Sequence, residues 1–227
     1  MTPDTPTPLP GRHRFFDVWS RVYDLELVQR AVYRPEQDAV LDVLAEEPPA
    51  SVLDVGCGTG QLAHRLRARF GGRVAGCDFS AGMLHEAATR DGRIDWVQGD
   101  ATRLPFDAGR FDAVVSTQAF HWFPDQDAAL AEIARVLRPG GRLVVTVVAP
   151  PLAAIRRLAA TTSRLLGQPL RWLPAGELGR RVEAAGLRVE RQRTVFRLPG
   201  ALLLPPLLTV ARRDGHDEKV TAAAQSD

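Results

Sequence analysis

The chain has 227 residues, of which 45% are hydrophobic and 25% are charged, as is ordinary for a soluble globular domain. Its formal net charge of +2 at pH 7 is too small to indicate a nucleic-acid or anionic-membrane partner by itself. Two cysteines do not make a disulfide framework, residues 1–11 lack the apolar core of a signal peptide, and no apolar run is long enough to cross a bilayer. We therefore expect a cytoplasmic protein without stable membrane insertion.

Composition along the chain predicts a single domain over residues 1–227. Its expected parts are a flexible tail (1–13), a helical cap (14–48), a cofactor-binding core (49–150), further helices and strands (151–212) and a second flexible tail (213–227). In the cap, an aromatic-rich segment precedes helices predicted at 25–32 and 35–44. The cap is either a layer packed on a sheet or a lid over a ligand, and the two interpretations are compatible.

From residue 51 the pattern alternates between strand and helix. The predicted strands span 51–56, 73–78, 94–98, 111–117 and 142–148, and the predicted helices span 60–70, 80–90 and 126–137. Pro139-Gly140-Gly141 indicates a turn before the fifth strand. Two helices, at 152–166 and 174–185, and two strands, at 187–197 and 207–212, are expected to follow. Such alternation implies right-handed crossovers and a parallel sheet.

The first strand leads into a loop with glycine at every second position, so that residues 51–60 read S-V-L-D-V-G-C-G-T-G. Glycines after a buried strand let the backbone turn sharply and approach a ligand, and the next helix directs its N-terminal amides at that ligand. Gln61 stands where the dinucleotide-binding fingerprint requires a glycine. The loop predicts a nucleotide-like cofactor, unless its glycines serve only a tight turn.

Acidic residues end the next two predicted strands. Asp78 follows the second strand, where a carboxylate accepts hydrogen bonds from the two hydroxyls of a ribose. The alternative role is an N-cap for the helix that starts near Ser80. Asp100 follows the third strand and is placed to accept from an adenine amino group, or to hold its own loop in an Asx-turn.

Polar and aromatic residues follow the fourth strand, in the segment Gln118-Ala119-Phe120-His121-Trp122-Phe123. Such a cluster past a strand end belongs to a site more often than to a core. His121 is the candidate general base because imidazole titrates near neutrality, and packing without proton transfer is the alternative. Cys57 and Cys77 lack a matching ligand set, so no metal site is predicted.

Five segments in order carry a family resemblance: V-L-D-V-G-C-G-T-G, Cys77-Asp78, Gly99-Asp100-Ala101, the strand over 111–115, and L-R-P-G-G-R-L over 137–143. They resemble the class I S-adenosylmethionine-dependent methyltransferase family over about residues 50–150. The resemblance implies an α/β, three-layer, Rossmann-like sandwich. Its mostly parallel seven-stranded sheet has the last strand antiparallel, and an N-terminal helical cap covers it.

The resemblance also implies site residues for S-adenosylmethionine. Contacts with the methionine part are expected from Asp54, Gly56, Cys57, Gly58, Gly60 and Gln118. Ribose and adenine contacts are expected from Asp78, Phe79, Met83, Asp100 and Ala101. Tyr23 is similar to a tyrosine that closes over the cofactor in several members, and His121 and Trp122 are expected to face the substrate.

The predicted function is methyl transfer from S-adenosylmethionine to a small-molecule oxygen, nitrogen or carbon nucleophile, a carboxylate among the options, by in-line displacement. A lipid or quinone-like acceptor is the alternative. A nicotinamide-dependent oxidoreductase is disfavoured by Gln61, and a nucleic-acid or protein methyltransferase by Ser116-Thr117-Gln118-Ala119 after the fourth strand. A non-catalytic cofactor-binding protein is the remaining option. We expect a monomer or homodimer without nucleic acid.

Overall fold

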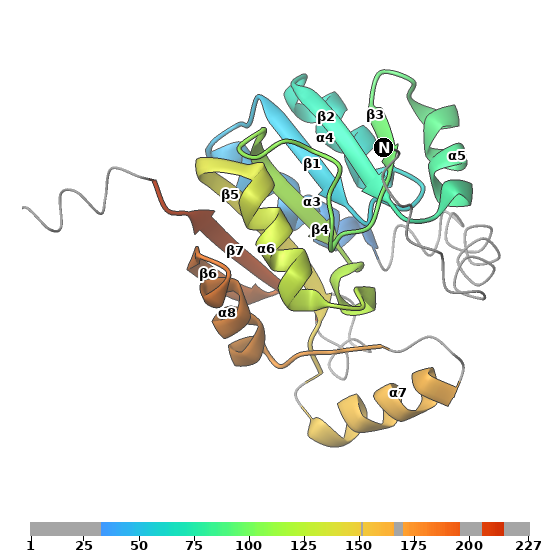
Figure 1. Ribbon diagram of the computed structural model, residues 1–227, viewed down its shortest axis with the longest axis vertical. Coiled ribbons are helices and arrows are strands. Elements are labelled where there is room, and N and C mark those ends of the chain that lie inside the picture. The colour runs from blue at the N-terminus through green and yellow to red at the C-terminus, as the bar shows by residue number, and fades with distance from the viewer. Residues whose placement is uncertain (1–32, 151, 166–169, 196–205, 216–227) are drawn as a thin grey trace, which may run out of the picture.

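The computed structural model describes residues 33–150, 152–165, 170–195 and 206–215. Within them, seven strands form one sheet in the order β3-β2-β1-β4-β5-β7-β6 (Figure 1). The strands are β1 (Ser51–Val55), β2 (Arg73–Asp78), β3 (Asp95–Gln98), β4 (Phe111–Thr117), β5 (Leu137–Val148), β6 (Leu187–Thr194) and β7 (Pro206–Arg213). β1 to β5 are parallel to one another, whereas β7 is antiparallel to both β5 and β6. The predicted sheet, with its last strand antiparallel, is confirmed.

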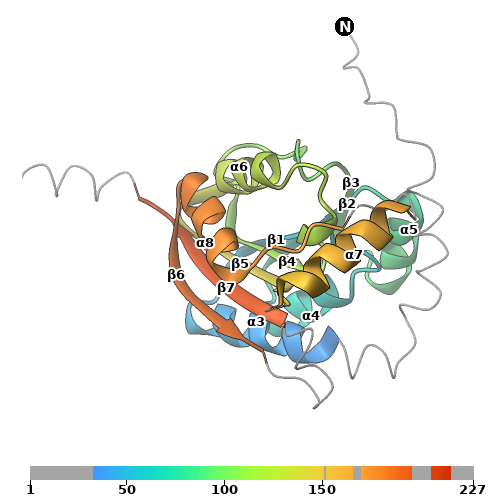
Figure 2. The same cartoon turned by 90° about the horizontal axis from the view of Figure 1, so that it is seen from below.

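Helices cover both faces of this sheet, which makes three layers (Figure 2). The helices of the described residues are α3 (Arg34–Glu46), α4 (Gln61–Phe70), α5 (Ala81–Arg90), η2 (Phe120–Trp122), α6 (Gln126–Val136), α7 (Ala153–Leu165) and α8 (Ala175–Ala184). One apolar cluster joins α3 and α4 to the sheet, and a second joins α6 and α8 to the opposite face. All five residues of β1 are buried because helices lie on both sides of it.

The observed boundaries follow the predicted ones with one instructive difference. β5 begins at Leu137 rather than at the predicted residue 142, because Leu137 already pairs with Phe111 of β4. The register then shifts before Ala113 pairs with Arg142, so Pro139-Gly140-Gly141 lies in a bulge within the strand. Gly140, at φ 75°, supplies the bend.

Several predictions lie outside the described residues. These are the first tail, the second tail beyond residue 215, the aromatic segment, the helix at 25–32 and the parts of the last elements at 166 and 196–197. The described part of the predicted cap is α3, which packs against β4, β5 and β7. Within the described ranges, no helix combines the length and the apolar character that crossing a membrane requires.

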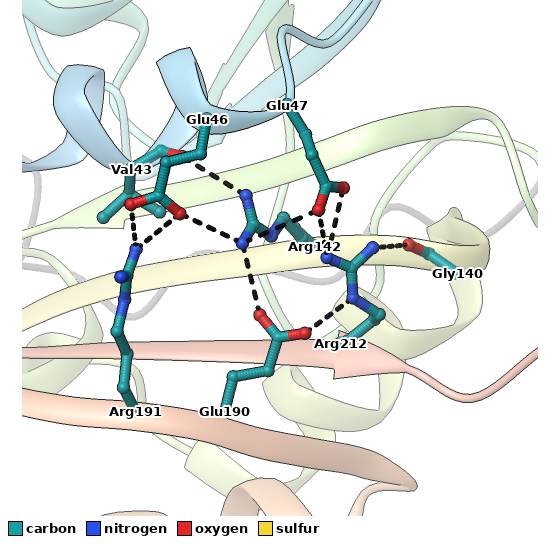
Figure 3. A network of polar contacts seen from close by, with 8 residues as sticks. All are labelled: Val43, Glu46, Glu47, Gly140, Arg142, Glu190, Arg191 and Arg212. Carbon is teal, nitrogen blue, oxygen red and sulfur yellow. Dashed lines mark hydrogen bonds and ion pairs between the residues drawn. The ribbon is translucent and has the colours of Figure 1, made fainter.

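A network of ion pairs lies near the amino ends of β4 and β5, on the side of α3, and we call it the amino-edge network (Figure 3). Its centre is Arg142, which is 8% exposed and donates to the Val43 carbonyl at 3.2 Å. The same guanidinium donates to Glu46 at 3.3 Å and to Glu190 at 3.4 Å.

Two further arginines, Arg191 and Arg212, extend the amino-edge network. Arg191 donates to Glu46 at 2.6 Å, and Arg212 donates to Glu190 at 2.7 Å and to Glu47 at 2.9 Å. The hydrogen bond from Arg191 lowers the pKa of Glu46. Every carboxylate of the network therefore has an arginine of this chain as its partner.

Candidate active site

The predicted site residues converge at the opposite edge of the sheet, where the parallel strands end. Because β1, β2, β3 and β4 point the same way, the segments that follow them meet at one edge. These segments are the loop over 56–60, the turns over 78–80 and 99–103, and η2 with the residues before it. Helix α4 begins directly after Gly60, so its N-terminal amides lie at this edge.

Hydrogen bonds fold the glycine loop back onto β2. The amides of Gly56 and Cys57 donate to the Cys77 carbonyl, at 2.7 and 3.2 Å. Gly56, Gly58 and Gly60 have φ values of 72°, 54° and 76°, a region that residues with a Cβ atom rarely adopt.

The three glycines have different surroundings. A Cβ atom at Gly56 would lie 2.3 Å from the Cβ of Ala119, and one at Gly60 would lie 2.4 Å from the Trp96 indole. A Cβ atom at Gly58 would meet nothing within 4 Å. Gly56 and Gly60 thus permit close packing of the loop, whereas Gly58 keeps backbone exposed to open space.

Asp54, near the end of β1, is a buried carboxylate that is 1% exposed. The described residues place no hydrogen-bond donor on either oxygen. Burial, and then the negative charge of Asp78, raises the pKa of Asp54 to about 7. The nearby Ala63 amide of α4 lowers the pKa slightly, but its geometry does not make a hydrogen bond to either oxygen. A positively charged or donating ligand group would satisfy these oxygens, so the site fits the ammonium of a methionine-like cofactor.

Asp78, at the end of β2, already joins two segments of the site. One oxygen accepts from the Gly58 amide at 2.9 Å, and the other accepts from the Ser80 amide at 2.9 Å. Burial raises the pKa of Asp78, and these amide hydrogen bonds oppose the rise. The N-cap of α5 is Ser80, which accepts from the Met83 amide at 3.2 Å, so Asp78 is not the helix cap.

The remaining predicted adenine contacts lie on the neighbouring segments. Met83 is buried in the first turn of α5, and Phe79 is half-buried before it. Asp100 is exposed and accepts from the amide and the hydroxyl of Thr102, at 2.8 and 2.9 Å. In this structure Asp100 therefore forms the Asx-turn, with Ala101 buried beside it.

At the end of β4, Gln118 has a φ of 55°, which is unusual for a residue with a side chain. Its side-chain amide donates to Glu36 of α3 at 2.7 Å. Thr146 of β5 donates its hydroxyl to the same Glu36 oxygen, also at 2.7 Å. Glu36 is 1% exposed, and sequence reasoning missed it. An acid in the first turn of a helix ordinarily indicates a solvated position, so the sequence held no signal for its burial.

His121 in η2 is 6% exposed, and burial lowers its pKa to about 3. No described residue is a hydrogen-bond partner of its Nδ1. The rings of His121 and Trp122 are 5.3 Å apart, and Trp122 is half-buried. The Arg171 amide donates to the His121 carbonyl at 3.0 Å, which joins the segment after α7 to η2. His121 is therefore a neutral imidazole near pH 7.

Cys57 and Cys77 are buried free thiols. Burial raises the pKa of Cys57 well above its usual value and that of Cys77 to about 12, so neither is a thiolate nucleophile. In the part of the chain that the structure describes, no His, Cys, Asp and Glu cluster forms a metal site. Tyr23 lies outside the described residues, and every other predicted site residue lies at this edge.

Comparisons with known proteins agree with the fold and its loops. Residues 53–145 match the methyltransferase domain family. The demethylmenaquinone methyltransferase of Mycolicibacterium gilvum is 37% identical over 193 residues, which cover 75% of this chain and 83% of that protein. The enzyme of the same name from Beutenbergia cavernae is 42% identical over 138 residues. That match covers 60% of this chain, and the chain spans only 57% of the relative's length.

Among solved structures, the complex of the Haloferax volcanii Trm112 methyltransferase activator with a methyltransferase contains a similar chain. Its TM-score is 0.73 at 25% identity, over 88% of this chain and 97% of that chain.

Proposed function

Because the chain belongs to the class I S-adenosylmethionine-dependent methyltransferases, we propose that it methylates a small quinone-like molecule. The buried carboxylate of Asp54, which has no donor among the described residues, carries the cofactor half of this proposal. The acceptor half rests on the relatives, which are named as demethylmenaquinone methyltransferases. A quinone-like acceptor was the alternative in the sequence-based prediction, and the relatives favour it over a carboxylate.

We assign the cofactor contacts as follows. Asp54 binds the ammonium of the methionine part, and the open backbone at Gly58 faces the carboxylate end. Asp78 accepts from the ribose hydroxyls, which requires its bond to the Gly58 amide to be shared or exchanged. Phe79 and Met83 flank the adenine, whose edge meets Asp100 and Ala101. When bound, S-adenosylmethionine supplies a methyl group made electrophilic by its sulfonium.

On the acceptor side, the protein's task is to align a nucleophile and exclude water. The buried His121 imidazole is neutral and a weak base, since its pKa is about 3. We therefore assign it a hydrogen bond that orients the acceptor rather than removal of a proton. Trp122 provides an apolar wall, and Glu36 holds the Gln118 side chain at the end of β4.

We further propose that the protein is a cytoplasmic monomer or homodimer that binds no nucleic acid. In this proposal residues 14–48 act as a cap over the 49–150 core, and Tyr23 closes on the cofactor.

Calorimetry with S-adenosylmethionine, S-adenosylhomocysteine and NADH tests the cofactor assignment. Both methyl-donor forms are expected to bind and NADH is not. Asp78→Ala is expected to weaken binding by about 1.5–3 kcal/mol, the size of a charge-assisted hydrogen bond. The matched control is Asp95→Ala, at an exposed aspartate of β3. Failure of both donor forms to bind would refute the function.

A radiolabelled-methyl assay with a short-chain, water-soluble demethylmenaquinol tests the acceptor. His121→Ala is expected to slow turnover while leaving cofactor affinity unchanged. Transfer to carboxylate metabolites with none to the quinol would refute the acceptor but keep the enzyme class.

A further inference from the structure

Helix α7 presents an outward face that mixes apolar and basic residues. Exposed residues recur at helical spacing at Ala154, Arg157, Leu158, Thr161 and Arg164, and we call this set the α7 outer face. Between them, Ile155, Arg156, Ala159, Ala160 and Ser163 are half-buried. Leu158 is 71% exposed and Leu152, just before the helix, is 57% exposed, the two most exposed large hydrophobic side chains in the described residues.

The charge of this segment has one sign. Residues 151–176 contain four arginines, at 156, 157, 164 and 171, and no aspartate or glutamate. No carboxylate in the described part of the chain lies within ion-pair distance of Arg157 or Arg164. This contrasts with the amino-edge network, where arginines and carboxylates are matched. An exposed face on which a leucine lies beside two arginines without a described carboxylate partner complements an anionic surface that has an apolar interior.

Helix α7 lies on the same side of the molecule as the acceptor side of the site, which is formed by His121 and Trp122. Helix α7 follows β5 and lies beyond the carboxyl ends of the strands (Figures 1 and 2). The chain then returns to η2, where the Arg171 amide donates to His121 and the Gln126 side chain donates to the Arg171 carbonyl at 3.1 Å. A surface held against α7 would therefore lie on the same side of the molecule as His121 and Trp122.

We propose that the α7 outer face docks the protein on the surface of an anionic phospholipid bilayer, from which it takes a membrane-resident acceptor. Leu158 enters the acyl boundary, and Arg157 and Arg164 contact lipid phosphates. The choice of occupant rests on the proposed function, because a quinone with a long apolar tail is dissolved in the bilayer. The contact is peripheral and reversible, since one leucine and two arginines bury far less apolar surface than a membrane-spanning helix does.

Sedimentation with vesicles tests the docking with the full chain. The protein is expected to bind mixed phosphatidylglycerol–phosphatidylcholine vesicles and to stay unbound with pure phosphatidylcholine. The double variant Arg157→Glu with Arg164→Glu should lower the partition coefficient by about 30-fold or more. Leu158→Gln, which leaves the charge unchanged, should lower it by about fivefold. The control is Arg69→Glu with Arg193→Glu, at two exposed arginines on α4 and β6.

An equal loss of binding in the control pair would overturn the proposal, because net charge alone would then govern binding. Absence of wild-type binding to the anionic vesicles, or binding to single-stranded RNA in its place, would also overturn it.

Methylation assays separate a failure of docking from a failure of the function. The α7 variants should retain full activity on the soluble short-chain quinol and lose about tenfold on a long-chain quinol in anionic vesicles. Equal activity of wild type and variants on the vesicle-bound quinol would refute docking while the function stands. Vesicle binding without methylation of either quinol would refute the function and leave the docking.

Discussion

Helix α3 runs between two edges of the sheet that differ in how their buried and charged side chains are paired. At its C-terminal end, Glu46 and Glu47 belong to the amino-edge network, in which each carboxylate is bound by an arginine of the same chain. At the carboxyl edge, Asp54 is buried with no described donor and His121 is buried as a neutral ring. The first arrangement stabilises the fold by itself. The second costs stability, because a buried carboxylate without a described donor is unfavourable, and the proposed cofactor would supply that donor.

Substitutions in the glycine loop are expected to change the free energy of unfolding most, and they test how closely the loop packs at the carboxyl edge. Gly56→Ala places a Cβ atom 2.3 Å from Ala119 at a φ of 72°, so we expect a loss of about 3–5 kcal/mol in the free energy of unfolding. Gly58→Ala, with the same backbone demand but open space, should cost about 1–2 kcal/mol. Urea denaturation of both variants measures the difference. Equal losses would mean that the loop packs alike at both positions.

The next effect concerns the amino-edge network. Arg142→Met removes the shared partner of Glu46 and Glu190, so we expect the free energy of unfolding to fall by about 2–3 kcal/mol. Arg138→Met, which removes a single ion pair of an exposed arginine with Asp112, should cost less than about 1 kcal/mol. Thermal unfolding at pH 7 compares the two. A cost as small for Arg142 as for Arg138 would show that the network adds little to stability.

Asp54→Asn is expected to act in the opposite direction. Because the folded pKa of about 7 lies above the unfolded value, Asp54 favours the folded state below about pH 4, and this contribution is lost as the pH rises through 7. The asparagine side chain carries no charge, so at pH 8 the unliganded variant should be more stable by about 1–3 kcal/mol and should bind S-adenosylmethionine more weakly.

The difference in the free energy of unfolding between Asp54→Asn and wild type, measured as a function of pH, reports the titration of Asp54 alone. His121 contributes in the other direction in both proteins, since a His with a lowered pKa loses stability as the pH falls from about 6.5 toward 3. Measuring unfolding between pH 5 and 8 should show the variant's advantage growing with pH. A constant difference would remove the assigned titration from Asp54.

The smallest expected effect comes from Glu36, which positions the Gln118 side chain at the end of β4. Glu36→Gln keeps one acceptor oxygen for Gln118 and Thr146 but replaces the other oxygen with a donating amide, so kcat/KM should fall by about five- to tenfold with little loss of stability. Asp42→Asn, at an exposed position of the same helix, is the matched control and should leave both quantities unchanged. Unaltered kinetics in the Glu36 variant would make this contact purely structural.

Local sequence patterns predicted the strands and the edge at which the site lies, because apolar runs, glycines and strand-terminal acids each depend on a few neighbouring residues. The comparisons confirm the predicted family, and the sheet topology confirms the predicted fold. The roles of the individual site residues stay predictions. The start of β5 was missed because a Pro-Gly-Gly segment reads as a turn, whereas pairing of Leu137 with Phe111 extends the strand across it.

Long-range packing accounts for the rest. Glu36 is buried only because α3 lies over the ends of β4 and β5, 82 and 110 residues away from its partners Gln118 and Thr146. The same holds for His121, whose ordinary pKa near neutrality made it a candidate base until its burial was known. The spacing of residues along the sequence indicates neither the contacts of Glu36 nor the burial of His121.

The Trp96 indole has a consequence for how this sequence can change. It fills the space that a Cβ atom would need at Gly60 and also at Gly76, where the separation would be 2.4 Å. Its Nε1 donates to the Asp91 carbonyl at 3.1 Å, which fixes the ring in place. The size of the side chain at position 96 therefore limits which residues fit at positions 60 and 76. A Cβ atom at Gly76 would also lie 2.9 Å from the Cys57 Sγ, so an alanine there requires both a smaller side chain at 96 and a shift of Cys57.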